Sequence, residues 1–148
     1  MDIDLVLAPV DGSAQSEHAA EYALAIADAY DAGLHLLFVL DEMLVRGIDS
    51  GEVSAEAVAE DHHDFATSVR AQLDERGHDA GLNYSSAAGF SPSRLRQSPG
   101  SVILDVAEEV DADFLVVPRE PGGGEPEEAI GRAALYVIEY ASQPVLSV

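Results

Sequence analysis

The chain has 148 residues, of which 47% are hydrophobic, and this length and composition fit one folded domain spanning 1–148. Twenty-eight Asp and Glu stand against seven Arg and no Lys, so the formal net charge is −21. Such a charge argues against nucleic acid or an anionic membrane as a partner, and the lack of Cys excludes disulfides and thiolate metal sites.

The composition also indicates the cellular location of the protein. No apolar run approaches the roughly 18 residues of a membrane span, and no charged-then-apolar leader begins the chain, so we expect a soluble, cytoplasmic protein. An acidic, lysine-free surface is typical of a salt-rich cytoplasm, because a Debye length of about 3 Å at 1 M salt screens self-repulsion. A halophilic source is therefore expected, and an ordinary acidic protein is the alternative.

Hydrophobic periodicity predicts strands and helices in alternation. Strands are expected at 3–10, 34–40, 82–88, 114–117 and 144–148. Helices are expected at 15–32, 54–76, 98–111 and 126–142, with Ser13 or Ser16 and Ser98 as caps and Gly33 ending the first helix. The stretches 43–51 and 89–98 are predicted to be loops, and a glycine-rich loop at 121–124 precedes the last helix.

This alternation predicts a doubly wound α/β domain, in which a parallel sheet carries helices on both faces. Ligands of such sheets bind beyond the carboxyl ends of the strands, where the strand order reverses. A strand that runs into a glycine-rich loop and a helix start is also a common anion site, because N–H groups and the helix dipole point outward there. The stretch 114–148 has this layout.

Four blocks of sequence, at 6–13, 35–39, 112–117 and 143–148, resemble the universal stress protein family in their order and spacing. The resemblance implies a five-stranded parallel sheet of order 3-2-1-4-5, as in adenine nucleotide alpha-hydrolase-like folds. It also implies a homodimer formed through the C-terminal strand, and in many members a bound ATP.

The ATP-binding members of that family carry Gly-x2-Gly-x9-Gly-Ser/Thr after the fourth strand. When the motif is anchored on Gly131, its other positions fall on Pro118, Pro121 and Arg132, so one position of four matches. Proline lacks an N–H donor, and neighbouring glutamates at 125, 127 and 128 compete for a helix N-terminus. The phosphate-binding loop is therefore predicted to be degenerate. The alternative is that the glycines at 122–124 form a phosphate-binding loop at a shifted position.

The base and ribose half of the family's pocket is retained. Pro9, Val10 and Asp11 match its first-strand contacts, and Val39 matches its apolar wall. The resemblance extends the cofactor-binding set to six residues on the phosphate side: Val117, Gly122, Gly124, Gly131, Arg132 and Ala133. Four of the seven Arg, at 94, 96, 119 and 132, fall near this edge, where they either bind phosphate or neutralise nearby glutamates.

Other chemistry is less well supported by the sequence. His62 and His63 diverge by about 100° on a helix, so a packed or surface role is favoured over a shared metal. Asp11, Ser13 and His18 could be arranged as a hydrolytic triad, but Ser13 is better explained as a helix cap.

The sequence therefore predicts a homodimeric regulatory or binding module, not an enzyme, with an unknown protein partner and no metal site. The alternative is a binder of ATP or AMP, with Mg²⁺, that uses arginines in place of the lost loop contacts. The edge strand 144–148 is expected to pair antiparallel with its symmetry mate.

Overall fold

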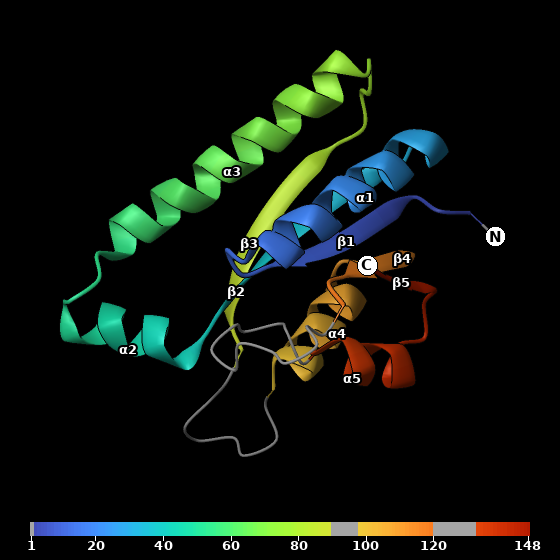
Figure 1. The fold of residues 1–148 in the computed structure, drawn as a ribbon. Helices are drawn as coiled ribbons and strands as arrows, with labels where there is room; N and C mark the ends of the chain where they lie inside the picture. The colour runs from blue at the N-terminus through green and yellow to red at the C-terminus, as the bar shows by residue number, and fades with distance from the viewer. Residues whose placement is uncertain (1, 90–97, 120–132) are drawn as a thin grey trace.

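The computed structural model of the chain describes residues 2–89, 98–119 and 133–148 (Figure 1). Strands and helices alternate along it, apart from one extra helix after the second strand. In chain order the elements are β1 (Leu5–Val10), α1 (Ala14–Tyr30), β2 (Gly33–Leu40), α2 (Glu42–Ser50), α3 (Ala55–Glu75), β3 (Leu82–Ala88), α4 (Pro99–Glu109), β4 (Phe114–Val117), α5 (Ala133–Tyr140) and β5 (Val145–Ser147).

The five strands form one parallel sheet in the order β3-β2-β1-β4-β5, which confirms the predicted topology. β1 and β2 pair along the whole of β1, from Leu5↔Gly33 to Val10↔Phe38. β1 and β4 share a shorter register, which ends at Leu7↔Leu115. The carboxyl ends of β1 and β2 therefore reach the same edge of the sheet together.

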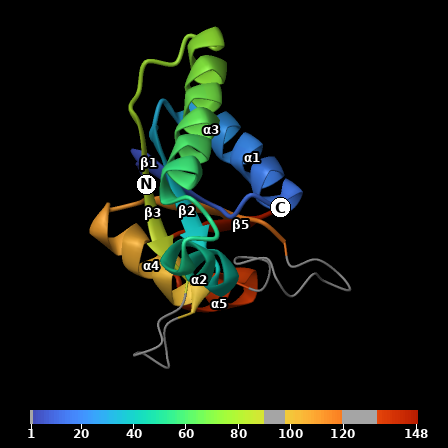
Figure 2. The ribbon, with the colours of Figure 1, turned by 90° about the vertical axis from the view of Figure 1, so that its left-hand side faces the viewer.

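Two apolar layers cover the sheet, because successive side chains of a strand point to opposite faces. Val6, Ala8 and Val10 pack under α1 and α3, whereas Leu7 packs with α4 and α5 on the other face. Figures 1 and 2 show the two helix layers on either side of the strands. Because both faces are covered, the central strands are nearly continuous apolar runs.

Serine caps begin two of the helices as predicted. Ser13 Oγ accepts the N–H of Ser16 at the start of α1, and Ser98 and Ser101 form a reciprocal capping box at the start of α4. The end of α1 differs from the prediction: Asp31 takes the left-handed conformation there (φ 55°), and Gly33 already belongs to β2. An Asp tolerates this conformation better than most residues do.

The predicted loop at 43–51 was wrong, because this stretch contains helix α2. Asp41 caps it by accepting the N–H of Leu44 at 2.7 Å, Arg46 pairs with Glu42 one turn earlier, and Gly51 ends it at φ 82°. Its interior Gly47 lowers helix propensity, but a Cβ there would lie 2.6 Å from Val53 Cγ2, so the glycine permits close packing.

The C-terminal region agrees with the prediction where the structure describes it. α5 ends at Tyr140, and β5 follows at Val145–Ser147 beside β4. The glycine-rich loop and the first part of the predicted helix at 126–142 lie outside the described residues, as does 90–97 of the predicted loop at 89–98. Within the described ranges, no helix is long and apolar enough to cross a bilayer.

Candidate functional site

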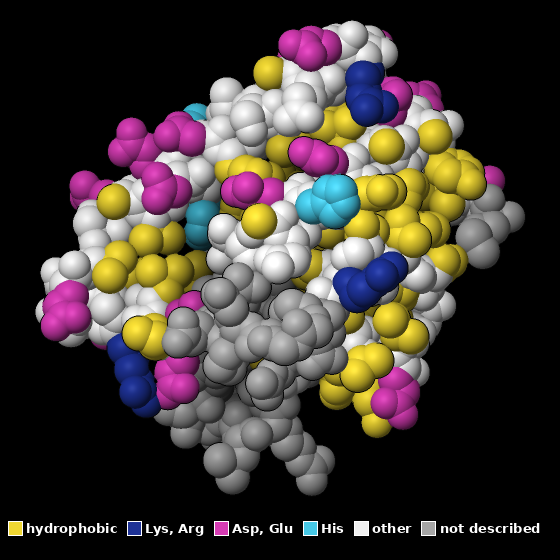
Figure 3. Space-filling model, viewed as in Figure 1, with side chains coloured by type: hydrophobic (Ala, Val, Ile, Leu, Met, Phe, Trp, Pro, Cys, Tyr) yellow, Lys and Arg dark blue, Asp and Glu magenta, His cyan; other side chains and the backbone are white. Residues whose placement is uncertain are grey.

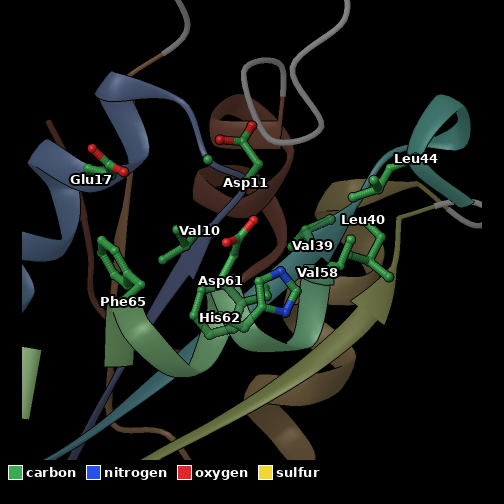
Figure 4. Close-up of a pocket in the computed structure, with 12 residues that line it drawn as sticks. Val10, Asp11, Glu17, Val39, Leu40, Leu44, Val58, Asp61, His62 and Phe65 are labelled. Carbon is green, nitrogen blue, oxygen red and sulfur yellow. The ribbon is translucent and has the colours of Figure 1, made fainter. Parts of the chain in front are cut away.

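A cavity of about 260 Å³ opens at the carboxyl ends of β1 and β2 (Figure 4). Its walls come from both strands, from the turn after β1, and from residues of α1, α2 and α3. The lining residues are Val10, Asp11, Gly12, Glu17, Phe38, Val39, Leu40, Leu44, Val58, Asp61, His62 and Phe65.

The turn after β1 is fixed by short-range hydrogen bonds. Asp11 Oδ1 accepts the N–H of Ser13 at 2.9 Å, and the N–H of Asp11 donates to Ser16 Oγ at 3.2 Å. Gly12 adopts φ 85°, a conformation that favours glycine, and this lets the chain turn directly from β1 into α1. As a result, Asp11 is held at the mouth of the cavity.

An aromatic cluster forms the floor of the cavity. The ring of Phe38 is stacked on the imidazole of His62, with centroids 4.0 Å apart and planes 10° apart. Phe65 meets Phe38 edge-on at 6.0 Å. His62 Nδ1 lies 3.1 Å from Ser86 Oγ on β3. Burial lowers the pKa of His62, and the nearby Asp61 carboxylate opposes this in part, so the neutral imidazole is favoured at neutral pH.

Three carboxylates surround the opening and come from three different segments: Asp11 after β1, Glu17 on α1 and Asp61 on α3. In Figure 4 the Asp61 carboxylate lies between Val10 and Val39. Among the described residues, no arginine lines this cavity. On the face shown in Figure 3, acidic side chains are scattered among apolar ones and basic side chains are sparse.

The shape and charge together limit the ligand. A volume of about 260 Å³ lies just below the roughly 300–1,000 Å³ that is usual for small-molecule sites. Apolar and aromatic walls suit a flat heterocycle, and the carboxylates can accept hydrogen bonds from its amino group or from sugar hydroxyls. The same carboxylates repel a phosphate chain, most strongly at low ionic strength.

Three of the predicted site residues, Val10, Asp11 and Val39, line this cavity together. Pro9 is buried in β1, where it pairs with Leu37 of β2. The structure places two others in the core that faces α4 and α5, namely Val117 and Ala133. The remaining members of the predicted set, Gly122, Gly124, Gly131 and Arg132, lie outside the described residues.

The sequence did not reveal most of the residues that α2 and α3 contribute to the lining of this cavity. His62 was placed on the apolar stripe of its helix but interpreted as a packed or surface residue. Leu44 fell in the stretch predicted as a loop. Nothing in the spacing of Phe38, His62 and Phe65 shows that the first half of α3 lies beside the ends of β1 and β2, so only the tertiary structure brings these rings together.

The structure also bears on the alternative chemistries. His62 Nδ1 is bonded to Ser86 and His63 Nδ1 to Tyr84, so the two imidazoles have different partners on β3. In the part of the chain that the structure describes, no group of three or more His, Asp or Glu is arranged to hold a metal ion. His18 faces Glu21 at 3.7 Å, while Ser13 caps α1.

Comparison with known proteins agrees with this architecture. The model of the universal stress protein family matches residues 3–148. The chain is 27% identical over 146 residues to universal stress protein MJ0531 of Methanocaldococcus jannaschii, covering 97% of this chain and 80% of the relative.

Two solved structures share the fold along nearly the whole chain. A universal stress protein in complex with cAMP is 20% identical with a TM-score of 0.68, covering 100% of this chain and 98% of the other. The universal stress protein of Archaeoglobus fulgidus in complex with dAMP is 20% identical with a TM-score of 0.59, and the match covers 98% of this chain and 96% of the other. At these identities the likeness establishes the fold, an adenine nucleotide alpha-hydrolase-like arrangement.

Proposed function

The chain belongs to the universal stress protein family, and we propose that it is a cytoplasmic regulatory module that binds an adenine nucleoside or its monophosphate without turning it over. The observation that carries this proposal is the cavity in which Val10, Asp11 and Val39 converge at the ends of β1 and β2. These residues match the family's base and ribose contacts. Parallel α/β sheets bind ligands at this edge.

Little of the binding energy is expected to come from contacts with a phosphate chain. Pro118 and Pro121 stand where the ATP-binding motif has glycines, and Arg132 stands where it has a hydroxyl. Asp11, Glu17 and Asp61 add negative charge around the opening. Each further phosphate would bring more charge toward these carboxylates. The two nucleotides named for similar structures, cAMP and dAMP, each carry a single phosphate.

A second candidate is a binder of ATP with Mg²⁺, in which arginines replace the lost loop contacts. Arg119 favours it, because this exposed residue lies two positions after the end of β4, where its backbone N–H donates a hydrogen bond to the C=O of Val148. Its guanidinium would suit a phosphate near the switch point of the sheet. The other three arginines of the predicted cluster, Arg94, Arg96 and Arg132, lie outside the described residues.

The module is proposed to act as a homodimer through β5. β5 is an edge strand whose inner side is bonded to β4: Pro144 C=O accepts from Leu115, and Val148 N–H donates to Val117. Since alternate residues of a strand direct their backbone groups to opposite sides, those of Val145 and Ser147 face outward.

The charge distribution supports a second copy of the chain as the partner. Residues 133–148 contain one acidic residue, Glu139, and no basic one, although the whole chain carries a net charge of −21. Two copies can therefore meet here with little mutual repulsion. Exposed apolar side chains on α5 adjoin the strand, including Leu135 at 66% and Ile138 at 51% exposure.

Thermal unfolding in about 1 M KCl tests the ligand. A compound present at 100 times its dissociation constant adds about 2.7 kcal/mol of stability, which is several degrees for a domain of this size. We expect adenosine and AMP to raise Tm, and Mg-ATP to raise it no further. A chain whose Tm responds to none of the three at millimolar concentration does not have the proposed function, and a response to Mg-ATP alone favours the second candidate.

A further inference from the structure

We propose that His62 sets the size of ligand that the site accepts, by separating the cavity described above from a second, apolar cavity beside it. The unmodified protein would then select a compact, unsubstituted adenine and reject one that carries an apolar group on its amino nitrogen. This inference rests on the proposed function and concerns the specificity of the same site.

The second cavity has a volume of about 270 Å³, close to the 260 Å³ of the first. It lies between α2, α3, the end of β2 and the middle of β3. Its walls are mostly aliphatic and aromatic, and it is lined by Leu40, Ile48, Ala55, Val58, Ala59, His62, Tyr84 and Ser86. Three residues line both cavities, namely Leu40, Val58 and His62. The partition between the cavities therefore consists of these three side chains.

Directed interactions hold the His62 part of the partition in place. Its imidazole is stacked on Phe38 with centroids 4.0 Å apart, and its Nδ1 lies 3.1 Å from Ser86 Oγ. Phe38 is itself only 3% exposed and is flanked edge-on by Phe65 and by Tyr84, at 6.0 and 5.7 Å. Swinging His62 aside would sacrifice both the stacking and the hydrogen bond, so the ring stays between the cavities.

The chemistry of the two spaces determines what the partition excludes. The first cavity has carboxylates at its opening and suits an amine-bearing base. None of the described residues that line the second is an Asp, Glu or Arg, so it would accept an alkyl or aryl group. A base with such a group needs both spaces at once, and His62 prevents this. Removing the imidazole would join the two cavities.

The experiment compares dissociation constants for adenosine and N6-benzyladenosine, measured by calorimetry in about 1 M KCl. In the unmodified protein we expect adenosine to bind more tightly. In His62→Ala we expect the ratio of the two constants to shift by at least about tenfold toward the benzylated compound, in the range by which apolar pockets discriminate. His63→Ala is the matched control, because this neighbouring imidazole is exposed and lines neither cavity.

The outcomes separate the inference from the proposed function. If His62→Ala still binds adenosine but its ratio stays at the unmodified value, or if His63→Ala shifts the ratio equally, the size-setting role is wrong. If the unmodified protein binds neither compound, the proposed function fails. In that case a crystal structure of His62→Ala still tests the role of His62 as a partition. One continuous cavity in the variant supports this role, whereas two cavities that remain separated by neighbouring side chains would overturn it.

Discussion

The imidazole of His62 and the phenyl ring of Phe38 lie almost parallel, 4.0 Å apart, and this contact joins α3 to the end of β2. One residue belongs to a helix and the other to the strand that the helix covers. Their contact closes the floor of a cavity whose opening is formed by the turn after β1. The site therefore depends on three segments that are distant in sequence.

Neutralising the carboxylates at the opening should favour ligands with more phosphate. In the double variant Glu17→Gln, Asp61→Asn we expect affinity for ATP to rise by roughly threefold to tenfold at low ionic strength and affinity for adenosine to change little, because only the nucleotide is charged. The gain should shrink in 1 M KCl, where the Debye length is about 3 Å. Titrations at two salt concentrations measure both effects.

The matched control for this double variant is Glu21→Gln, Asp64→Asn. These residues lie on the same two helices but do not line the cavity, and the change in net charge is identical. An equal gain in ATP affinity in the control would mean that total charge, and not the position of the carboxylates, governs nucleotide choice.

Replacing Gly100 should destabilise the packing of α4 against α5. A Cβ at this position would lie 2.6 Å from Tyr136 Cδ1 and 2.9 Å from its Cβ. We expect Gly100→Ala to lower the free energy of unfolding by about 1–3 kcal/mol, the usual cost of overpacking. Gly81→Ala is the control, since nothing lies within 4 Å of a Cβ there. Urea unfolding in which both variants match the unmodified protein would contradict this account of the helix contact.

Stability should fall as the pH drops through the range in which unfolded histidine is protonated. His35 is 8% exposed and its Nε2 is paired with Ser85 Oγ at 2.9 Å; burial lowers its pKa below 6.5. Below pH 6.5 the unfolded chain therefore binds a proton that the folded chain does not, and the free energy of unfolding decreases until the folded pKa is reached. His62 acts in the same direction, because burial is the larger cause of its shift.

His35→Gln tests this dependence, because an amide can keep a hydrogen bond to Ser85 without titrating. The loss of stability between pH 7.5 and 5.5 should be smaller in the variant than in the unmodified protein. His18→Gln, which changes an exposed imidazole, is the control. A slope that is unchanged in His35→Gln would contradict the assignment to this buried histidine.

Blocking the outer side of β5 should yield monomers. Ser147→Pro removes an N–H that faces away from β4, so the fold should tolerate the change, as edge strands tolerate proline. Antiparallel pairing with a second copy, however, would lose a hydrogen bond and would be hindered sterically by the proline ring. Sedimentation should show a monomer for Ser147→Pro and a dimer for Ser147→Ala. A Ser147→Pro chain that remains dimeric would place the interface elsewhere.

Much of the fold could be predicted from the sequence because the central strands are fully buried. Val6, Leu7 and Leu36, for example, belong to short apolar runs that are typical of doubly covered parallel strands. α2 could not be predicted in the same way: it has nine residues with a glycine inside, and caps at Asp41 and Gly51 determine its ends.

Only those site residues that lie at the ends of strands could be predicted from the sequence. Val10 and Val39 could be found because they lie at the ends of their strands and match a family pattern. His62 and Phe65 could not, since their role depends on how α3 is laid over the sheet, and helical periodicity is the same for core and site residues.

The most direct test of the account is to locate adenosine on the protein. Methyl and amide NMR spectra of the labelled chain, recorded in about 1 M KCl during titration with adenosine, report each contact separately. We predict the largest saturable shifts at Val10, Val39 and Val58, with little change at Val145 on β5. Binding that leaves these three valines unchanged would show that this cavity does not hold the base.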